Sequence, residues 1–337
     1  MIRGVVATAP GKVTLFGEHA VVYGEPAIVT AINKRLEVEV TERKDDLLKI
    51  RIVNLPLTDI TIIFRDKRRI GAELSSEKAE KAVAYIKKAI ELTSRHIGEY
   101  RGVNITVRSD MPVSAGLGTS AAVSVATITA YSTLLGKKLS LEEIARLGYL
   151  TELGVQGAAS PMDTSITTYG GSLYIKPTEG GAPIIRKVEL PPNMKVVIGY
   201  VPRTSTTKEL VAEVKELKST FPVLIENIMK TIGELTERAL DALKREDLKS
   251  LGKLMDINHG LLSSLGVSTR ELDIMVYAAR EAGALGAKLT GAGGGGCIIA
   301  IVPRDKLENV ISAIEVVGGR AFAAEVNCPG VKASPTI

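Results

Sequence analysis

Residues 111–122 have the composition of a loop that binds an anion. They read Met-Pro-Val-Ser-Ala-Gly-Leu-Gly-Thr-Ser-Ala-Ala and lie between a strand-like run and a long apolar run. Such a turn points successive backbone N–H groups, and the positive end of the following helix dipole, toward one spot. We therefore expect a nucleotide phosphate there. The residues expected to line it are Pro112, Val113, Ser114, Ala115, Gly116, Leu117, Gly118, Thr119, Ser120, Ala121 and Ala122.

The better-known phosphate loops do not account for this stretch. The chain has no G-x-x-x-x-G-K-[ST] loop and no protein-kinase signature. Residues 291–296, Gly-Ala-Gly-Gly-Gly-Gly, formally match the dinucleotide fingerprint G-x-G-x-x-G. That fingerprint opens a helix, whereas the strand-like run Cys-Ile-Ile-Ala-Ile-Val follows here. A nicotinamide-dependent dehydrogenase is therefore a disfavoured alternative.

The elements around the loop follow from apolar periodicity. Val103, Ile105 and Val107 alternate with polar residues and predict a strand before the loop, and the apolar run to Leu135 predicts a helix after it. A capping box over 140–143 predicts a further helix, which carries Glu152 toward its end. The small-residue stretch 157–164 is expected to be a loop that presents one carboxylate, Asp163.

The rest of the chain mixes strands and helices in both halves, which indicates an α+β protein. We expect two short strands before residue 17, at 4–8 and 12–16, with Pro10-Gly11 between them. A second capping box is expected over 268–271. The glycine-rich run at 179–183 is the best candidate boundary, which divides the chain into domains 1–180 and 181–337. The remaining strands are expected near 36–41, 49–53, 60–64, 172–176, 196–201, 297–302 and 320–326, and the remaining helices near 75–90, 207–218, 222–244, 247–263 and 304–316.

Composition narrows the class of protein. A length of 337 residues suits two domains, and 45% hydrophobic with 24% charged residues is typical of a soluble globular chain. The net charge is +5, but aromatic residues make up 4% and Trp is absent, so we expect no nucleic-acid role. No stretch approaches the roughly 20 apolar residues of a membrane helix, and no signal peptide is expected. Two cysteines, Cys297 and Cys328, indicate a reducing compartment, and we expect a cytoplasmic protein. Cys297 is expected to be a small buried hydrophobe.

Three motifs occur in order along the chain. The first combines Pro10-Gly11-Lys12 with Gly17-Glu18-His19, the second lies within 112–122, and the third is Lys288-Leu-Thr-Gly-Ala-Gly-Gly-Gly-Gly-Cys297. Together they closely resemble the motifs of the GHMP small-molecule kinases, over residues 9 to about 300. The resemblance implies a two-domain GHMP kinase fold, with a ribosomal-protein-like N-terminal domain and a ferredoxin-like C-terminal domain. A homodimer is common among relatives and is expected on that ground.

Within this superfamily the first motif is most similar to that of the mevalonate kinases. Galactokinases share Gly-Glu-His but usually continue with Thr-Asp-Tyr, which is missing here, and homoserine kinases lack the block. The stretches 160–163, 168–171 and 257–262 also look like mevalonate kinase sequence. The resemblance implies ATP-dependent phosphorylation of (R)-mevalonate at its 5-hydroxyl, a step toward isoprenoids. The alternatives are another GHMP kinase, for phosphomevalonate or a sugar, and a nucleotide sensor without catalysis.

The resemblance also implies roles for single residues. Asp163 would receive the hydroxyl proton, and Lys12 would keep that carboxylate ionised and steady the substrate and the transferring phosphoryl charge. Ser120 and Glu152 would bind Mg²⁺, which accepts few protein ligands.

The same resemblance implies that Glu18, His19 and Thr207 contact the substrate together with Lys12. Around Arg203 the spacing departs from the family, so Arg203 receives no role from the sequence.

Overall fold

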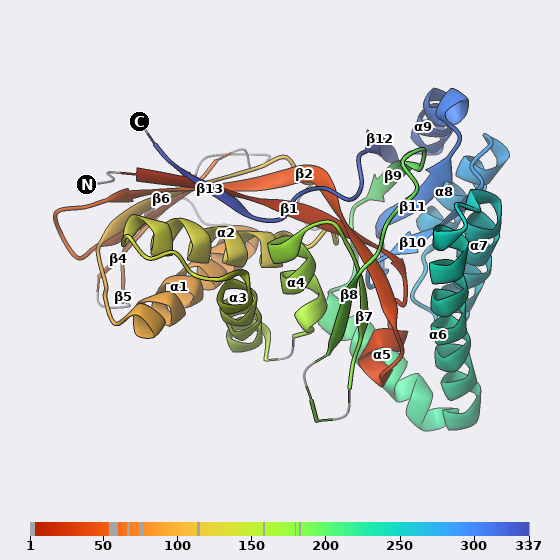
Figure 1. Cartoon of the computed structure of the whole chain (residues 1–337), viewed down its shortest axis with the longest axis horizontal. Helices are drawn as coiled ribbons and strands as arrows, with labels where there is room; N and C mark the ends of the chain where they lie inside the picture. The colour runs from red at the N-terminus through yellow and green to blue at the C-terminus, as the bar shows by residue number, and fades with distance from the viewer. Residues whose placement is uncertain are drawn as a thin grey trace.

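A computed structural model of the chain describes residues 4–53, 60–65, 68–73, 77–112, 115–157, 159–178, 180–181 and 183–336. Within these ranges the strands form a nine-stranded and a four-stranded sheet. Figure 1 shows the larger sheet with helices against one face, and the smaller sheet with its own helices at the far end of β1 and β2. Both chain ends lie at the opposite end of the larger sheet. The mixture of helix and sheet agrees with the predicted α+β class.

The larger sheet is built around two long neighbouring strands, β1 and β2. Its path runs β13-β1-β2-β6-β3-β4-β5, and β7 joins β2 and β8 beside it. All pairs are antiparallel except β3 with β6. The strands are β1 (Gly4–Phe16), β2 (Ala27–Glu42), β3 (Leu48–Ile52), β4 (Ile60–Arg65), β5 (Arg68–Glu73), β6 (Val103–Ser109), β7 (Ser172–Lys176), β8 (Ile184–Lys187) and β13 (Lys332–Pro335).

The prediction of two short strands before residue 17 was wrong, because β1 is continuous through Pro10. Proline lacks the N–H that a strand ladder needs, and the pairing of β1 with β2 shifts register between Pro10 and Gly11. Because the register shift accommodates Pro10, β1 stays paired with β2 on both sides of the residue at which the sequence suggested a break. Strand β1 therefore carries Lys12 of the first motif within the larger sheet and, two residues later, contacts the second half of the chain through Thr14.

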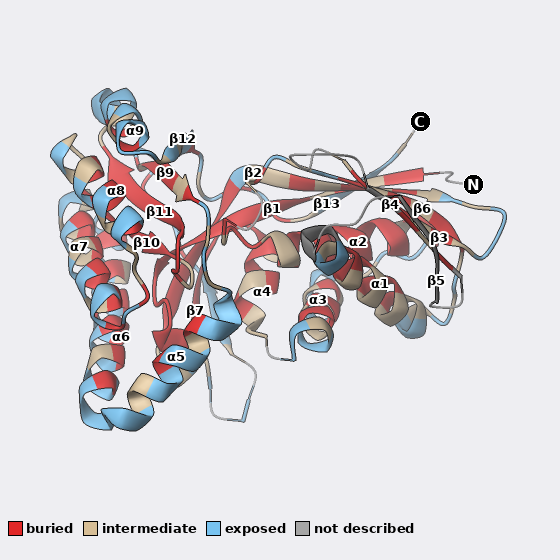
Figure 2. Cartoon of the chain, turned by 180° about the vertical axis from the view of Figure 1, so that it is seen from behind, coloured by how far each residue is buried: buried red, intermediate tan, exposed pale blue. Residues whose placement is uncertain are grey.

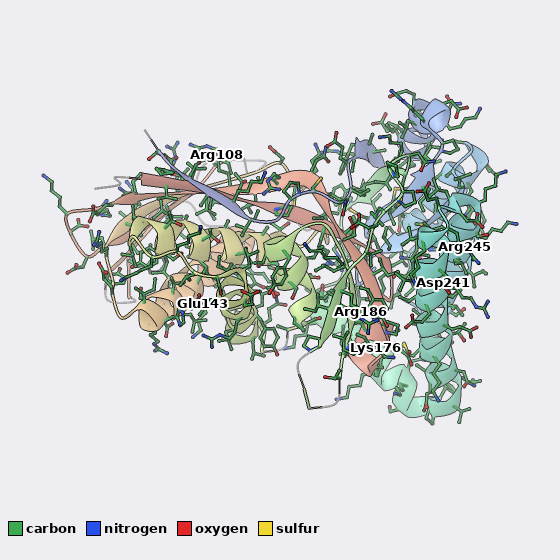
Figure 3. All side chains as sticks on the ribbon, in the orientation of Figure 1. Arg108, Glu143, Lys176, Arg186, Asp241 and Arg245 are labelled. Carbon is green, nitrogen blue, oxygen red and sulfur yellow. The ribbon has the colours of Figure 1, made fainter. Side chains whose placement is uncertain are left out.

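One face of the larger sheet is buried by four helices. These are α1 (Glu77–Ile97), α2 (Thr119–Leu134), α3 (Leu141–Gln156) and α4 (Pro161–Tyr169). Helix α2 lies innermost, with its residues almost all buried, which explains why its sequence is apolar on every side. The predicted capping box at α3 is confirmed: the Glu143 N–H donates to Ser140 Oγ, and the Ser140 N–H donates to Glu143 Oε2. The other face of the sheet carries exposed charge pairs such as Arg108 with Glu37 (Figure 3).

The four-stranded sheet has the order β10-β11-β9-β12 and is antiparallel throughout. Its strands are β9 (Lys195–Val201), β10 (Gly286–Thr290), β11 (Gly296–Val302) and β12 (Arg320–Ala324). Its helices are α5 (Thr207–Thr220), α6 (Pro222–Lys244), α7 (Leu248–Ser264), α8 (Arg270–Glu281) and α9 (Leu307–Val316), and two 3-10 turns, η1 (Ala20–Tyr23) and η2 (Arg304–Lys306), complete the chain. Figure 2 shows β10 and β11 buried and the outer faces of α5 and α6 exposed, whereas the edge strand β12 is mostly exposed or half-buried.

Three expectations for the second half need correction. Strand β10 was not predicted, because its five residues include a lysine that breaks the apolar pattern. The capping box predicted over 268–271 does not form: Thr269 caps α8 by accepting from the Leu272 N–H, and Leu272 has no side-chain acceptor to bond back. The Ser268 hydroxyl instead donates to Asp273. The last strand ends at Ala324, before the predicted residue 326.

The division of the chain near residue 180 stays a prediction. Strands β8 and β13 both follow that residue and both add to the larger sheet. The Arg35 guanidinium donates to the carbonyls of Pro329 (2.8 Å) and Gly330 (2.7 Å), and the Gly171 N–H donates to the carbonyl of Cys328. Residues 328–335 thus lie against the first half of the chain and are hydrogen-bonded to it.

A buried histidine joins α7 to the smaller sheet. His259 Nδ1 accepts from the Leu289 N–H at 3.3 Å, and His259 Nε2 donates to Asp273 at 3.1 Å. Burial lowers the pKa of His259 to about 4, although the Asp273 carboxylate acts in the opposite direction. The ring is therefore neutral in the folded protein near pH 7, and its two nitrogens have fixed roles.

This depressed pKa predicts a loss of stability in acid. As the pH falls from 6.5 to about 4, the unfolded histidine takes a proton before the folded one, so the free energy of unfolding decreases. A His259→Gln variant should be less stable at pH 7, and its difference from the wild type should narrow by on the order of 2 kcal/mol toward pH 4. Urea unfolding followed by circular dichroism at pH 4–8 measures this.

The matched control is His96→Gln, since His96 pairs with Glu143 at the surface. Its unfolding free energy should stay within about 1 kcal/mol of the wild type. A His259→Gln curve parallel to the wild type over the whole pH range contradicts the argument.

Candidate active site

The two sheets meet where β1 reaches β10. The Thr14 N–H donates to Thr290 Oγ1 at 2.9 Å, and that hydroxyl donates back to the Thr14 carbonyl at 3.0 Å. This reciprocal pair fixes the first motif against the third motif, although the two are far apart in the sequence. The predicted site residues of both halves gather around this junction.

The predicted anion loop opens α2. Gly116 and Gly118 have φ of 80° and 79°, the left-handed region that favours glycine, and Gly118 is the N-cap of α2 without a side-chain cap. The first helical bond runs from the Ala122 N–H to the Gly118 carbonyl, so the N–H groups from Gly118 to Ala121 precede it and lack intrahelical acceptors. These are the donors that an anion requires. Val113 and Ser114 lie outside the described residues, and Pro112 has no N–H.

The second glycine-rich run is a hairpin that packs against this loop. It joins β10 to β11, and five of its glycines have positive φ: Gly291, Gly293, Gly294, Gly295 and Gly296. A Cβ on Gly291 would lie 3.6 Å from the Gly116 carbonyl oxygen, and one on Gly296 would lie 3.1 Å from that of Ala115. Glycine permits this approach of backbone to backbone. A hairpin is not the strand-turn-helix of a dinucleotide site, so the dehydrogenase alternative is excluded.

Lys12 and Asp163 form an ion pair beside the loop. Lys12 Nζ lies 3.0 Å from Asp163 Oδ1, and the lysine side chain is 5% exposed against 28% for the aspartate. The expectation that Asp163 lies in a loop was wrong, because it occupies the first turn of α4. Ser160 caps that helix by accepting from the Met162 N–H, and Pro161 stands at its first position, a combination typical of a helix start.

Asp163 keeps acceptor capacity despite this ion pair. Among the described residues, its Oδ1 has no hydrogen-bond partner in addition to the ionic contact with Lys12. A carboxylate that is charged, partly open and next to an ammonium group is able to accept a proton from a bound hydroxyl.

Ser120 and Glu152 are adjacent, and Glu152 is buried while Ser120 is half-buried. The Ser120 hydroxyl donates to Glu152 Oε1 at 2.7 Å, and Glu152 is 4% exposed. Burial raises the pKa of Glu152 to about 7, the Asp163 carboxylate raises it further, and the Ser120 hydrogen bond and Lys12 oppose the shift. Glu152 is thus no surface charge but a buried carboxylate with no ion-pair partner among the described side chains.

These two residues fit a divalent cation that also takes ligands from elsewhere. A hydroxyl and a carboxylate oxygen are ligands that Mg²⁺ accepts, and a cation would neutralise the desolvated Glu152 charge. Within the described ranges no cluster of three or more His, Cys, Asp or Glu side chains suits a metal. A cation here would therefore complete its shell with water or ligand oxygens, as Mg²⁺ commonly does.

Glu18 and His19 are positioned by residues from the second half. The Glu18 carboxylate is bonded to the Lys288 ammonium and accepts from Asn258 Nδ2 at 3.3 Å. His19 Nε2 donates to the Ala292 carbonyl at 2.9 Å, and burial lowers the pKa of His19. The neutral ring leaves Nδ1 as an acceptor. Lys288 opens the third motif, which was the only sequence signal for its role, and Asn258 lies in the family-like stretch 257–262.

Arg203 is a site residue that the sequence reasoning omitted. Its Nε and Nη2 donate to the Gly293 carbonyl at 3.2 and 3.0 Å, and its Nη1 donates to Thr207 Oγ1 at 3.3 Å. The Nη1 atom also lies 3.8 Å from where a Cβ on Gly116 would stand. The guanidinium thus lies beside both glycine loops and next to Thr207, the exposed first residue of α5. No spacing rule links residue 203 to residue 116, because the fold brings them together.

Two other features lie apart from this chemistry. Burial raises the pKa of Cys297 to about 12, so its thiol is inert, as expected of a small buried hydrophobe.

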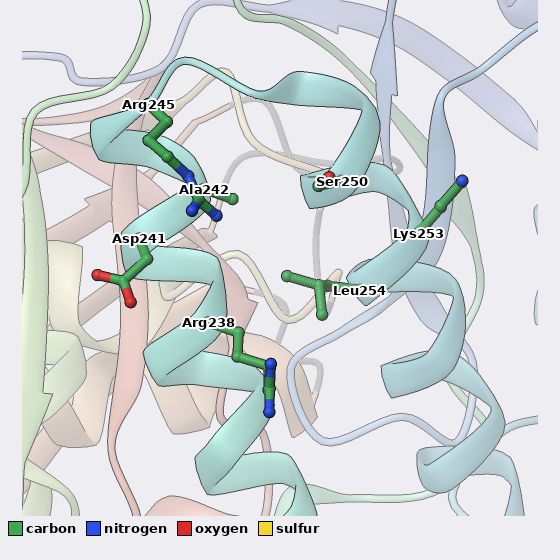
Figure 4. Close-up of a pocket in the computed structure, with 7 residues that line it drawn as sticks. All are labelled: Arg238, Asp241, Ala242, Arg245, Ser250, Lys253 and Leu254. Carbon is green, nitrogen blue, oxygen red and sulfur yellow. The ribbon is translucent and has the colours of Figure 1, made fainter.

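A groove of about 380 Å³ lies between α6 and α7 (Figure 4). Its lining includes no predicted site residue and comprises Arg238, Asp241, Ala242, Arg245, Ser250, Lys253 and Leu254.

Comparisons with known proteins show the family to which the chain belongs. Family models described as "GHMP kinases N terminal domain" and "GHMP kinases C terminal" match residues 84–171 and 239–317. A mevalonate kinase of Pyrococcus horikoshii is 44% identical over 98% of each chain. One of Methanothermobacter thermautotrophicus is 39% identical over 96% of this chain and 98% of its own.

Solved structures give the same picture. The Methanococcus jannaschii mevalonate kinase is 34% identical with a TM-score of 0.79, over 95% of this chain and 97% of its own. An L. major mevalonate kinase in complex with R-mevalonate is 25% identical with a TM-score of 0.79, over 96% and 95%. Of the helices that the structure describes, none has the length and apolar character to cross a membrane.

The close approach of the two glycine loops predicts a position-specific effect of a methyl group. Gly296→Ala should weaken binding of a non-hydrolysable ATP analogue at least about tenfold, because its Cβ would press on the Ala115 carbonyl at 3.1 Å and Arg203 Cγ at 3.3 Å. Isothermal titration calorimetry measures this. Gly136→Ala is the control, since Gly136 has φ of +73° with nothing within 4 Å.

Both substitutions carry the left-handed strain of about 1–2 kcal/mol, and the close contacts at Gly296 add to it, so the melting temperature of Gly296→Ala should fall at least as far as that of Gly136→Ala. Unchanged nucleotide affinity in Gly296→Ala, or an equal loss in Gly136→Ala, contradicts the prediction.

Proposed function

The chain belongs to the GHMP kinase family, and from that premise we propose that it transfers the γ-phosphoryl group of ATP to the 5-hydroxyl of (R)-mevalonate. The products are 5-phosphomevalonate and ADP, in a step toward isoprenoids. The observation that carries the proposal is the Lys12–Asp163 ion pair of 3.0 Å beside the glycine loop at the start of α2. It supplies a proton acceptor and a fixed cation next to a phosphate-binding backbone.

The phosphate side of the reaction belongs to the loop and to α2. Phosphoryl transfer asks a protein mainly to position its reactants and to neutralise charge. The N–H groups from Gly118 to Ala121 would hold ATP phosphate oxygens at the positive end of α2. Arg203, which lies beside Gly116 and is bonded to Gly293, would add a fixed positive charge over the same phosphates.

On the acceptor side, Asp163 would take the proton of the attacking hydroxyl, and Lys12 would stabilise the charge that develops on the transferred group. His19 Nδ1, an acceptor in the neutral ring, would receive a hydrogen bond from a substrate hydroxyl. Thr207, held by Arg203, would reach the substrate from α5. Glu18 was expected to contact the substrate, but its two oxygens are bonded to Lys288 and Asn258, so it would act as a buried neighbour of His19.

We propose that ATP is used with Mg²⁺, which Ser120 and Glu152 would hold. When bound, the ion would neutralise charge on the phosphate oxygens and orient them. Its arrival would also relieve the charge that burial leaves uncompensated on Glu152.

A kinase for phosphomevalonate or a sugar is not favoured. The curated relatives that match over nearly the whole chain at 39–44% identity are named as mevalonate kinases. The similar galactokinase and phosphomevalonate kinase structures are 23% and 16% identical, which indicates a shared fold alone. A sensor without catalysis would need no ion-paired base, yet Lys12, Ser120, Glu152 and Asp163 are all in place. A homodimer and a cytoplasmic location remain proposals.

A coupled assay of ADP release with purified protein tests the function. Mevalonate should give turnover, whereas phosphomevalonate and galactose should not. Asp163→Asn should lower kcat about 10²–10⁴-fold, because the amide accepts no proton, while the KM for ATP stays within about threefold. The control Asp241→Asn changes an exposed carboxylate on α6 and should retain full rate.

Absence of mevalonate-dependent turnover rejects the proposed reaction. Turnover at the wild-type rate in Asp163→Asn rejects the role of Asp163 but leaves the substrate assignment standing.

Glu152→Gln separates the metal role from the fold. The change keeps an acceptor for Ser120 but removes the charge, so the Mg²⁺ concentration for half-maximal rate should rise at least about tenfold. Without metal, the variant should be more stable than the wild type above pH 7. The folded wild-type carboxyl has a pKa raised from 4.5 to about 7, so the wild type loses on the order of 2 kcal/mol as the pH rises through this window.

Thermal unfolding at pH 5–9 and Mg²⁺ titrations of the rate measure the two effects, with Glu234→Gln on the exposed face of α6 as the control. An unchanged Mg²⁺ requirement in a folded Glu152→Gln protein would show that the ion is held elsewhere.

A further inference from the structure

Lys288 is a buried charge that the reaction itself does not use. It lies in β10 and is 0% exposed, yet its neighbours in the strand are apolar. Its ammonium group donates to the Glu18 carboxylate and to the Leu289 carbonyl, the latter at 2.7 Å. A buried ammonium group is tolerated only where such partners replace water. The pairing with Glu18 is therefore a condition for Lys288 to occupy this position.

Glu18 depends on the same contact. Its side chain is 1% exposed, and its second oxygen accepts from Asn258 Nδ2, a side chain that is itself fully buried. Glu18 thus joins three segments that are distant in sequence: the end of the first motif, α7 and β10. Both oxygens are engaged by protein groups, so this carboxylate lies in the interface of the two halves.

The residue that follows Glu18 is His19, and its conformation is unusual. His19 has φ of 59°, the left-handed region that non-glycine residues rarely adopt. Its ring is held on the other side by the Ala292 carbonyl of the glycine hairpin. The backbone at His19 is therefore fixed between the buried Glu18 anchor and the ring contact, and releasing the anchor would let this strained residue relax.

We propose that Lys288 is a positioning residue for the acceptor substrate: by holding Glu18 it fixes His19 against the glycine hairpin in the geometry that binds mevalonate. The inference rests on the proposed function and deepens it. Lys288 acts through Glu18 and touches no reactant. The ATP side depends on the loop at α2, so loss of Lys288 acts mainly on the acceptor.

The test is a comparison of the two Michaelis constants. Lys288→Met removes the charge with little change in length, and it should raise the KM for mevalonate at least tenfold while the KM for ATP changes less than threefold. Lys288→Arg retains a cation and should recover part of the loss. The double variant Glu18→Gln with Lys288→Met removes both charges together, and its KM for mevalonate should be lower than that of Lys288→Met alone.

Lys253→Met is the matched control, because Lys253 is an exposed lysine on α7 that lines the groove between α6 and α7. It should leave both Michaelis constants unchanged. Circular dichroism and thermal unfolding of every variant establish which of them fold. Asn258→Ala leaves the ion pair intact and removes a single hydrogen bond to Glu18, so it gives a second measurement even where Lys288→Met fails to fold. Its expected effect is a rise of about threefold in the KM for mevalonate alone.

Equal changes in both Michaelis constants across the folded variants would overturn the proposal, since a purely structural role affects both substrates. Unchanged Michaelis constants in folded Lys288→Met would overturn it as well. So would a double variant whose KM for mevalonate exceeds that of Lys288→Met. Failure of the proposed function is distinguishable, because the wild type itself would then show no turnover with mevalonate.

Discussion

The site depends on the close approach of two glycine-rich backbone segments. The loop at the start of α2 and the hairpin between β10 and β11 come from different halves of the chain. Their carbonyls and glycine Cα atoms lie so close that a single methyl group on Gly296 would stand 3.1 Å from the Ala115 oxygen. Two further site residues depend on the same hairpin, because His19 donates to the Ala292 carbonyl and Arg203 donates to the Gly293 carbonyl. The glycines are therefore required by the packing of the two loops and are not mere points of flexibility.

The charges around this contact are arranged in buried or half-buried pairs. Lys12 is paired with Asp163, and Lys288 with Glu18. Because removing a charge from water is costly, each pair makes the position of one element depend on another. Glu152 differs, since burial raises its pKa to about 7 and, among the residues that the structure describes, only the Ser120 hydroxyl donates a hydrogen bond to it. The contrast between paired carboxylates and Glu152 identifies where a cation from outside would be most stabilising.

Local patterns in the sequence predicted much of this molecule. Helix α2, strand β7 and the capping box of α3 depend on neighbouring residues, so periodicity and capping rules were sufficient. The family motifs singled out residues 112–122 and Asp163 for the roles proposed above. The helix start before Asp163 was missed although Ser160 and Pro161 are a local signal for it. Other features were beyond local rules. Strand β1 continues through Pro10 because β2 accommodates a register shift. The pairing of Lys288 with Glu18 and the place of Arg203 are tertiary contacts, for which no local signal exists.

The return of β13 to β1 has a consequence for how the chain is made. Residues 332–335 form the last strand of the sheet that residues 4–16 begin, and the Arg35 contacts with Pro329 and Gly330 fasten the segment before it. During synthesis on the ribosome the first strand appears long before its outer neighbour, so its open edge is a template for mispairing until residues 332–335 have been made. Completion of the first sheet is therefore a late event in folding. A nascent chain that stalls after the catalytic motifs would have its chemistry in place but one edge of its largest sheet still exposed.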